Sequence, residues 1–241
     1  MDWKERTRLL VKEEGIEKLQ KAHVLVVGLG GVGSFAAEML CRAGIGKLTL
    51  VDHDIYNLTN LNRQIGAFHS TIGLSKVEVI KARLLDINPD IEIIALKEYM
   101  KDEKMVGLLT AEKYTYVVDA IDTFSPKVFF IYHCLNNGLQ LVSSMGTGGK
   151  TKPDDIRIAD FSETYECRLA YVLRKKLRKK NVTGGFKAVF SIEKLNKNAV
   201  IRIEEENKKS NVGTISYMPP IFGGFCASVV INSILKEECD G

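Results

Sequence analysis

HVLVVGLGGVGS (residues 23–34) and LTLVDHDIYNLTNLNRQ (residues 48–64) are the stretches that decide the fold. The first is an apolar run that enters a turn with G-x-G-x-x-G spacing, formed by Gly28, Gly30 and Gly33, with Gly31 between them. The second is an apolar run that ends at Asp52, 19 residues after Gly33. This order predicts a β-α-β unit whose glycines admit a phosphate beside a helix N-terminus and whose acid binds ribose. By itself the pattern does not identify the nucleotide, and it favours NAD.

Strand-like and helix-like segments alternate along the first 150 residues. Further strands are expected at Ile91–Leu96, Tyr116–Asp119 and Leu139–Ser143. Helices are expected at Val32–Ala43, Ser75–Ile87, Asp102–Thr110 and Pro126–Asn136. The alternation predicts an α/β, Rossmann-like doubly wound, mostly parallel sheet with helices on both faces and a C-terminal extension. Ligands of such sheets bind beyond the carboxyl ends of the strands, where the glycine turn, Asp52–Arg63 and Asp122 all fall.

The two ends of the chain elaborate this core. Residues 5–21 favour one N-terminal helix or two short ones. After residue 150 we expect a strand at Ile156–Ala159, a helix at Leu169–Lys180, sheet-extending strands at Val189–Glu193 and Val200–Glu204, a mobile loop at Lys208–Asn211, and a last helix at Ile221–Lys236. We therefore expect one unit, 1–241, made of a nucleotide-binding core (1–150) and an extension (151–241).

The sequence favours a cytoplasmic protein. The N-terminus, MDWKERTRLL, is too charged for a secretory signal. Tyr217–Leu235 carries no formal charge, but we expect Pro219 and Pro220 to leave about 15 helical residues, fewer than a membrane span needs. A core helix is therefore favoured, with membrane or partner contact as the alternative. The cysteines form no C-x-x-C pair, which favours reduced, buried thiols over a zinc site: Cys41, Cys134, Cys167, Cys226 and Cys239.

Basic charge is concentrated in the extension. The net charge is +4, yet residues 1–150 hold 18 Lys/Arg and 18 Asp/Glu, so the excess lies after residue 150. Residues 167–192 contain eight basic residues and no acidic one, which favours an anionic partner over a merely solvated helix. Six of them are expected on outward faces of the Leu169–Lys180 helix: Arg174, Lys175, Lys176, Arg178, Lys179 and Lys180.

Phosphate-handling side chains follow the glycine turn, and a dehydrogenase has no need of them. They are Asp54, Asn60, Arg63, Gln64, Lys76 and Asp122. Arg63 and Lys76 could neutralise the charge of a triphosphate. Asn60 could orient oxygens near the α-phosphate, and Asp122 could hold Mg²⁺. The alternative is that Arg63 and Lys76 pair with Asp54 and Asp86 on a solvated face.

Four motifs in order carry a family resemblance: GLGGVGS, LVDHDIYNLTNLNRQIGA, GLSKVEV and VVDAIDT. Over Arg6–Met145 the chain resembles the ubiquitin-activating-enzyme-like adenylyltransferases. The resemblance implies ATP, with a substrate carboxylate attacking the α-phosphate to give an acyl-adenylate and pyrophosphate. It implies ribose binding by Asp52, phosphate binding by Asn60, Arg63 and Lys76, and Mg²⁺ at Asp122. It also implies a homodimer in which Arg6, or alternatively Arg8, reaches the partner's site.

The extension is similar to one branch of that superfamily. GTGGKTKPDDIRIADFSET, LAYVLRKKLRKKNV and AVFSIE resemble the tRNA threonylcarbamoyladenosine dehydratases. This implies that the carboxylate of N6-threonylcarbamoyladenosine in tRNA is adenylated and that the carbamoyl group then closes a ring, with net loss of water. The basic helix would position the tRNA. Cys167-Arg168 replaces an Asp-Pro of some members and Ala188 replaces a cysteine, so no catalytic thiol is implied.

Three other functions remain open from sequence. One is an adenylyltransferase acting on the C-terminal carboxylate of a ubiquitin-like sulfur-carrier protein, although the paired C-x-x-C motifs of those branches are absent. A sulfur-transfer or cysteine-desulfurase-type partner belongs to the same set of expectations. The others are a nucleotide-sensing module without catalysis and, last, a dehydrogenase.

Overall fold

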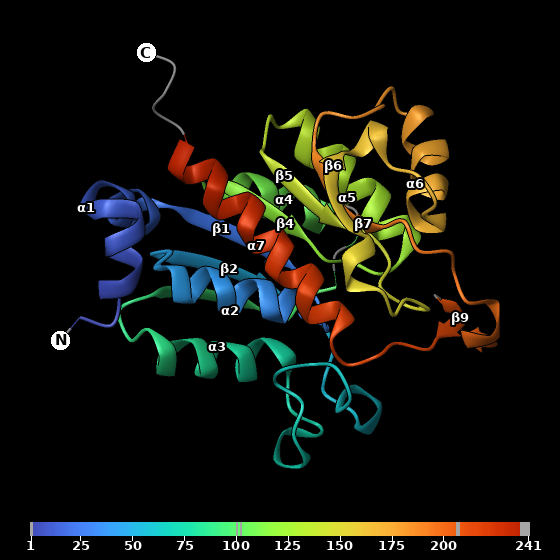
Figure 1. Cartoon of the computed structure of the whole chain (residues 1–241), viewed down its shortest axis with the longest axis horizontal. Coiled ribbons are helices and arrows are strands. Elements are labelled where there is room, and N and C mark those ends of the chain that lie inside the picture. Colours follow the sequence, from blue (N-terminus) through green and yellow to red (C-terminus); the bar gives the residue numbers. More distant parts are fainter. Residues whose placement is uncertain (1, 100, 102, 206–207, 237–241) are drawn as a thin grey trace.

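A seven-stranded sheet forms the centre of the chain in the computed structural model, which describes residues 2–99, 101, 103–205 and 208–236. Its strand order is β3-β2-β1-β4-β5-β7-β6, and all neighbours are parallel except β6 with β7 (Figure 1). The strands are β1 His23–Val27, β2 Lys47–Val51, β3 Glu92–Leu96, β4 Tyr116–Asp119, β5 Leu141–Ser144, β6 Ile156–Asp160 and β7 Lys187–Ser191. The predicted Rossmann-like, doubly wound sheet is confirmed.

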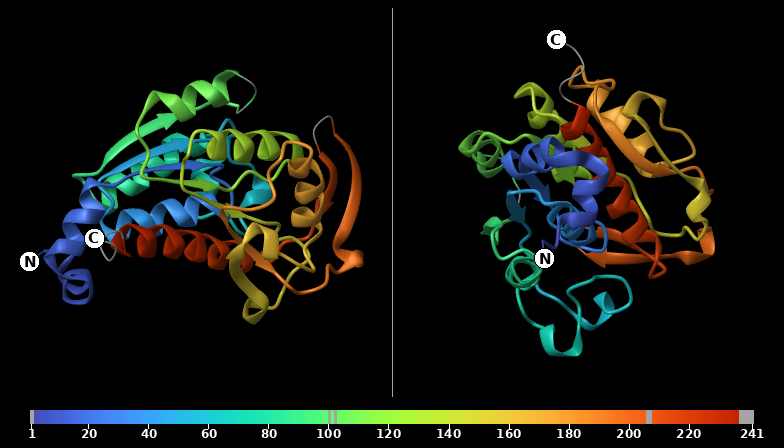
Figure 2. Two further views of the ribbon diagram at one scale, coloured as in Figure 1. Left: turned by 90° about the horizontal axis from the view of Figure 1, so that it is seen from above. Right: turned by 60° about the vertical axis from the view of Figure 1, so that its left-hand side comes forward.

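Helices cover both faces of this sheet (Figures 1 and 2). On one face lie α2 (Gly33–Ala43), α3 (Lys76–Ile87) and α7 (Met218–Lys236), with α1 (Glu5–Lys21) against the end of α7; on the other lie α4 (Glu103–Ala111), α5 (Phe124–Asn136) and α6 (Arg168–Arg178). Val24 and Val26 of β1 join the first core, and Leu25 and Val27 join the second. Because side chains alternate along a strand, a strand between two helical layers is buried on both faces, as all five residues of HVLVV are, and four of them are apolar.

The long apolar segment near the C-terminus is a core helix, as expected, but its start differs. We expected Pro219-Pro220 to break it, and instead α7 begins at Met218 with both prolines in its first turn. There a missing N–H is harmless, because first-turn amides have no helical partner. By length and composition α7 would suffice to cross a membrane, yet 44% of its apolar window is buried. It packs closely on α2: a Cβ on Gly223 would lie 2.5 Å from the carbonyl oxygen of Val32.

Two expectations for the extension were wrong. Val200–Glu204 does not extend the main sheet: β8 (Val200–Glu205) pairs with β9 (Lys208–Val212) in a separate two-stranded sheet. The expected loop at Lys208–Asn211 is therefore part of a strand. β7 lies between β5 and the antiparallel β6, so it offers no free side to β8, and the residues 208–211 are strand because they pair with β8.

Of the two alternatives expected for the N-terminal segment, the structure shows two short helices joined at a kink. α1 contains a kink at Lys12, whose φ of 63° and ψ of 179° are not helical. Cys239 and the first residue of the expected helix at Asp102–Thr110 lie outside the described residues.

Candidate active site

The glycine turn joins β1 to α2 and packs directly on the segment after β4. Gly28 has a φ of +89°, and a Cβ there would lie 2.7 Å from the carbonyl oxygen of Ala120. A Cβ on Gly33 would lie 1.8 Å from the carbonyl oxygen of Gly28. Gly30 differs, because the nearest atom to its Cβ position is Gln64 Nε2 at 3.9 Å. Two glycines therefore close the turn, while Gly30 leaves space at the N-terminus of α2, where N–H groups favour an anion.

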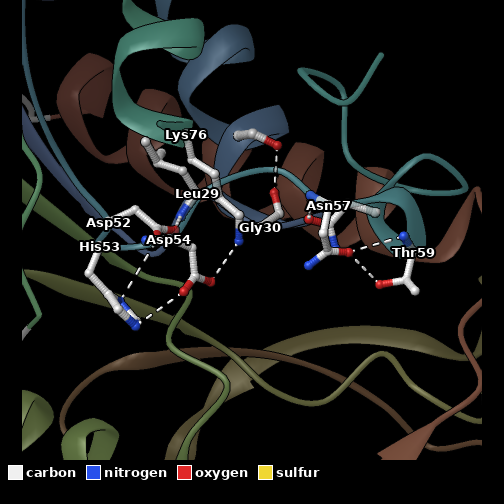
Figure 3. A network of polar contacts seen from close by, with 10 residues as sticks. Leu29, Gly30, Asp52, His53, Asp54, Asn57, Thr59 and Lys76 are labelled. Atoms are coloured by element: carbon white, nitrogen blue, oxygen red, sulfur yellow. Dashed lines mark hydrogen bonds and ion pairs between the residues drawn. The ribbon is translucent and has the colours of Figure 1, made fainter. Parts of the chain in front are cut away.

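Asp52 connects this turn to the loop after β2. Its carboxylate is 8% exposed; Oδ2 accepts a hydrogen bond from Leu29 N at 2.6 Å and Oδ1 accepts one from Asp54 N at 2.8 Å (Figure 3). The acid thus lies at the carboxyl end of β2 beside the glycines, as expected. Its role in binding ribose stays a prediction.

Lys76 begins α3 and points back to the same edge. Its ammonium lies 2.8 Å from Asp54 Oδ2, and His53 Nε2 lies 3.1 Å from Asp54 Oδ1 (Figure 3). The alternative pairing of Lys76 with Asp54 is therefore real. However, Lys76 is only 5% exposed and lies beside the nucleotide turn, not on a solvated face. Asp52, His53 and Asp54 also bring ligand atoms within 4.8 Å of one another.

The loop from Asn57 to Gln64 is held by its own side chains. Asn57 Oδ1 accepts from Thr59 N at 3.0 Å, and Asn60 Oδ1 accepts from Asn57 N at 3.1 Å, which caps a short 3-10 turn. Asn60 is buried as a result. Gln64 is also buried, and its Oε1 has no hydrogen-bond partner among the described residues. A buried acceptor without a partner is costly unless a ligand satisfies it.

Arg63 is half-buried in that loop and faces the segment after β4. Its Nη1 donates to Thr59 O at 2.8 Å and to Asn62 Oδ1 at 2.9 Å. Burial lowers the pKa of the Arg63 guanidinium, while the negative charge of exposed Asp122 acts in the opposite direction. Asp122 is thus within electrostatic range of Arg63, and no described partner of Arg63 is Asp54 or Asp86. Such a guanidinium is suited to phosphate.

One polar cluster was not found from sequence. Lys127 of α5 and Asp119 of β4 form an ion pair, and Ser143 Oγ donates to the same Asp119 Oδ2 at 2.7 Å. Asp119 Oδ1 accepts from Ile121 N at 3.0 Å. The cluster lies directly behind the loop that carries Asp122. The sequence predicted Asp119 only as the last residue of a strand. No motif near Lys127 in the sequence distinguishes it from a surface lysine.

The structure does not bring Arg6 to the glycine turn of its own chain. Arg6 is exposed on α1, which precedes the amino end of β1, whereas the turn follows the carboxyl end of that strand. Arg8, the alternative, is paired with Asp2 and with Glu13, the latter at 2.6 Å.

The basic segment is α6 with the two lysines that follow it, because the helix ends at Arg178 and not at Lys180 as expected. Not all of its charges face outward. Lys175, Lys176, Arg178 and Lys179 are exposed, as expected. For the other two the expectation was wrong. Arg174 donates to Thr164 O at 2.7 Å, and the ammonium of Lys180 lies 4.4 Å from the ring centre of Tyr132. Both long side chains lay their apolar stems on the fold, so their position depends on neighbours outside the helix.

Comparison with known proteins shows similarity over both the core and the extension. The sequence matches the ThiF family over residues 5–240. It is 41% identical over 246 residues to the tRNA threonylcarbamoyladenosine dehydratase of Bacillus subtilis, covering 96% of this chain and 94% of that protein. The crystal structure of the Escherichia coli tRNA N6-threonylcarbamoyladenosine dehydratase in complex with ATP has a TM-score of 0.89 at 33% identity, covering 99% and 98%. A molybdopterin-synthase adenylyltransferase of Salmonella typhimurium is 38% identical over 130 residues, covering 54% and 51%.

Proposed function

The chain belongs to the ThiF family, and we propose that it is an ATP-dependent tRNA threonylcarbamoyladenosine dehydratase. The observation that carries the proposal is that relatives with this activity in their names match the core and the extension alike. The sulfur-carrier alternative has weaker support, because the molybdopterin-synthase adenylyltransferase matches 54% of the chain. The site edge agrees with nucleotide cleavage, since it gathers Arg63, Lys76 and Asp122 beside the glycine turn.

The proposed reaction has two steps. A carboxylate oxygen of the threonyl group attacks the α-phosphorus of ATP, and the bond to pyrophosphate breaks to leave an acyl-adenylate. The neighbouring carbamoyl group then attacks the acyl carbon, loses a proton and closes a ring, while the carbon–oxygen bond to AMP breaks. The carboxylate oxygen leaves with AMP, so the nucleoside loses the elements of water.

We assign the parts of ATP to residues at the carboxyl edge of the sheet. Asp52 binds the ribose, and the turn Gly28–Gly33 with the N-terminus of α2 binds phosphate. Asn60, Arg63, Gln64 and Lys76 surround the phosphates, where fixed positive charge stabilises the charge that develops on the α-phosphate. Lys76 already has its ammonium held by Asp54 at 2.8 Å, so it needs little reorganisation.

Asp122 is the candidate ligand for Mg²⁺. An exposed carboxylate beside Arg63 has the hard oxygen donors that this ion prefers, and the phosphates would complete its coordination. Bound Mg²⁺ would neutralise phosphate charge.

Partners follow from the same proposal. The exposed cations of α6 bind the tRNA backbone, which agrees with a cytoplasmic location. Arg6 completes the site of a second subunit, so the working form is a homodimer built from single units of 1–241, each with its core (1–150) and extension (151–241). A sulfur-transfer or cysteine-desulfurase-type partner finds no support in the thiols, since the four described cysteines are buried and burial raises the pKa of Cys41 to about 11 and of Cys226 to about 12.

The test is nucleoside mass analysis. The protein is incubated with tRNA that carries threonylcarbamoyladenosine, with and without ATP and Mg²⁺, and the digested nucleosides are weighed. We expect loss of one water only with ATP, in step with release of AMP and pyrophosphate. Lys76→Gln should abolish it, and Lys81→Gln, a half-buried lysine on the same helix, should not. An unchanged nucleoside mass, or pyrophosphate exchange that requires a carrier protein ending in Gly-Gly, would refute the proposal.

A further inference from the structure

A cavity of about 570 Å³ lies between the nucleotide loop and the extension. Its lining includes Asn62 on one side and Gly149, Lys150 and Glu193 on the other, with Thr214 closing the end. Asn62 Nδ2 donates to Thr214 O at 2.9 Å, so the loop that carries Arg63 is tied to the segment after β9. The volume is in the range of small-molecule sites. The cavity is therefore placed next to the proposed phosphate site, and it is formed only when core and extension meet.

Lys150 is the buried cation of this cavity. The residue is 5% exposed, and its ammonium makes no hydrogen bond and no ion pair with any residue that the structure describes. Its Nζ is nevertheless not among the fully buried polar atoms, so the ammonium keeps access to solvent at the cavity. Lys76 and Lys127, the other buried lysines near the site, each have a carboxylate oxygen at 2.8 Å. Buried charges in proteins are normally paired, because leaving water without a partner costs free energy. Lys150 thus offers an unpaired ammonium at the cavity, where an anion from outside can reach it.

The acids near Lys150 do not supply that anion. Glu193 uses its carboxylate to hold the chain beyond Lys150: it accepts from Thr151 N at 2.7 Å and from Lys152 N at 2.9 Å. Burial lowers the pKa of the Lys150 ammonium, opposed by the longer-range charges of Glu193, Asp155 and Glu166 and by Cys167. Burial therefore outweighs these charges.

We propose that Lys150 binds the carboxylate of the threonylcarbamoyl group and that this cavity holds the modified base, so that the carboxylate faces the α-phosphate beside Arg63. The inference rests on the proposed function and deepens it. Lys150 is a positioning residue for the nucleophile: its ammonium pairs with the carboxylate in the ground state and releases it as the acyl–phosphate bond forms. A backbone phosphate of tRNA is the competing anion, and the exposed cations of α6 are better placed for it.

The test measures the affinity of two RNAs. One is an anticodon stem-loop that carries N6-threonylcarbamoyladenosine, and the other is the same stem-loop with the threonyl carboxylate as its methyl ester. We expect the wild-type protein to prefer the acid by about 10- to 100-fold, the range of a charge-assisted hydrogen bond in a buried site. Lys150→Gln should remove this preference and Lys150→Arg should keep part of it. Lys152→Gln, at an exposed lysine two residues on, is the matched control and should keep it all.

Two results would overturn the assignment. One is an acid preference that survives Lys150→Gln, or that the wild type never shows. The other is a loss of ATP affinity, or of affinity for both stem-loops equally, in Lys150→Gln, because that would place Lys150 on a phosphate. Equal melting temperatures of the variants exclude unfolding, and Lys150→Arg serves if Lys150→Gln does not fold. Failure of the proposed function is separate: it appears as unchanged mass of modified tRNA with the wild-type protein, whatever the stem-loops show.

Discussion

Lys127 and Asp119 form an ion pair in which both side chains are fully buried, with Nζ 2.8 Å from Oδ2. Lys127 Nζ also donates to Ile121 O at 3.0 Å, and Ile121 N donates to Asp119 Oδ1. The pair therefore holds the backbone N–H and the carbonyl of Ile121, in the segment that follows β4. This is the segment on which Gly28 packs and from which Asp122 extends, so the buried pair fixes the backbone at this side of the candidate site.

Lys127→Met is expected to lower the free energy of unfolding by about 3–5 kcal/mol, because it leaves a buried carboxylate without its counter-charge. The double variant Lys127→Met/Asp119→Asn should recover part of the loss, since it removes the charge as well. Urea unfolding followed by circular dichroism measures both. Lys179→Met, at an exposed position, is the control and should stay within about 0.5 kcal/mol of wild type. Equal loss in the two lysine variants would contradict this reading of the pair.

The glycine turn offers a matched pair of substitutions. Gly33→Ala should destabilise the fold, because its Cβ would lie 1.8 Å from the backbone oxygen of Gly28. Gly30→Ala should fold normally, since its Cβ meets nothing closer than 3.9 Å, and yet weaken ATP binding by filling the space meant for phosphate. Melting temperature and equilibrium ATP titration separate the two effects. Unchanged ATP affinity in Gly30→Ala would place the phosphates elsewhere.

The exposed charges of α6 should appear in the salt dependence of tRNA binding. Lys176→Gln/Lys179→Gln is expected to weaken binding and to reduce the slope of log K against log salt by up to about 2, one for each lost phosphate contact. Lys21→Gln/Lys113→Gln removes two exposed lysines that precede the amino ends of β1 and β4, and it should leave the slope unchanged. Filter binding across a salt series gives both slopes. Equal slopes for the two double variants would remove α6 from the tRNA interface.

Acid should destabilise the protein in part through His23. Its ring is buried, with Nε2 2.8 Å from Thr49 Oγ1, and burial, aided by Lys47, depresses its pKa below 6.5 despite Glu112 and Glu92. The unfolded chain therefore takes up this proton first, so the stability contributed by neutral His23 is present above about pH 6.5 and is lost as the pH falls below it. Urea unfolding at several pH values should show a flatter profile for His23→Gln than for wild type. His69→Gln, at an exposed histidine, should leave the profile unchanged, and an unflattened profile in His23→Gln would contradict the assignment.

Much of the arrangement of the candidate site could be predicted from the sequence because its parts are local signals, while the roles of its residues stay predictions. Gly28, Gly33 and Asp52 lie in one β-α-β unit, where turn chemistry and apolar runs are set by near neighbours, and the loop with Asn60 and Arg63 follows directly. Parallel strands present their carboxyl ends at one edge of the sheet, and this rule predicted that Asp122 and Lys76 lie at the same edge as the glycine turn.

The expectations that were wrong concern contacts between distant parts of the chain. At the far edge of the sheet β6 pairs with β7, and β8 pairs with β9 in a separate sheet, so the pattern of Val200–Glu204 alone predicted a strand but not its partner. Likewise Arg174 and Lys180 belong to the same basic run as the exposed lysines, and nothing in the sequence sets them apart. Their contacts with Thr164 and Tyr132 depend on the tertiary structure.

By itself, then, the sequence determined the doubly wound fold, the nucleotide turn and the charged edge, because periodicity and turn residues act over a few positions. Tertiary structure decided which lysines are buried and what they meet. Lys127 finds Asp119, whereas Lys150 finds no carboxylate among the described residues, although both are ordinary lysines in the sequence. The physical reason is that the free energy of a charge depends on how much water surrounds it, and the fold alone sets that.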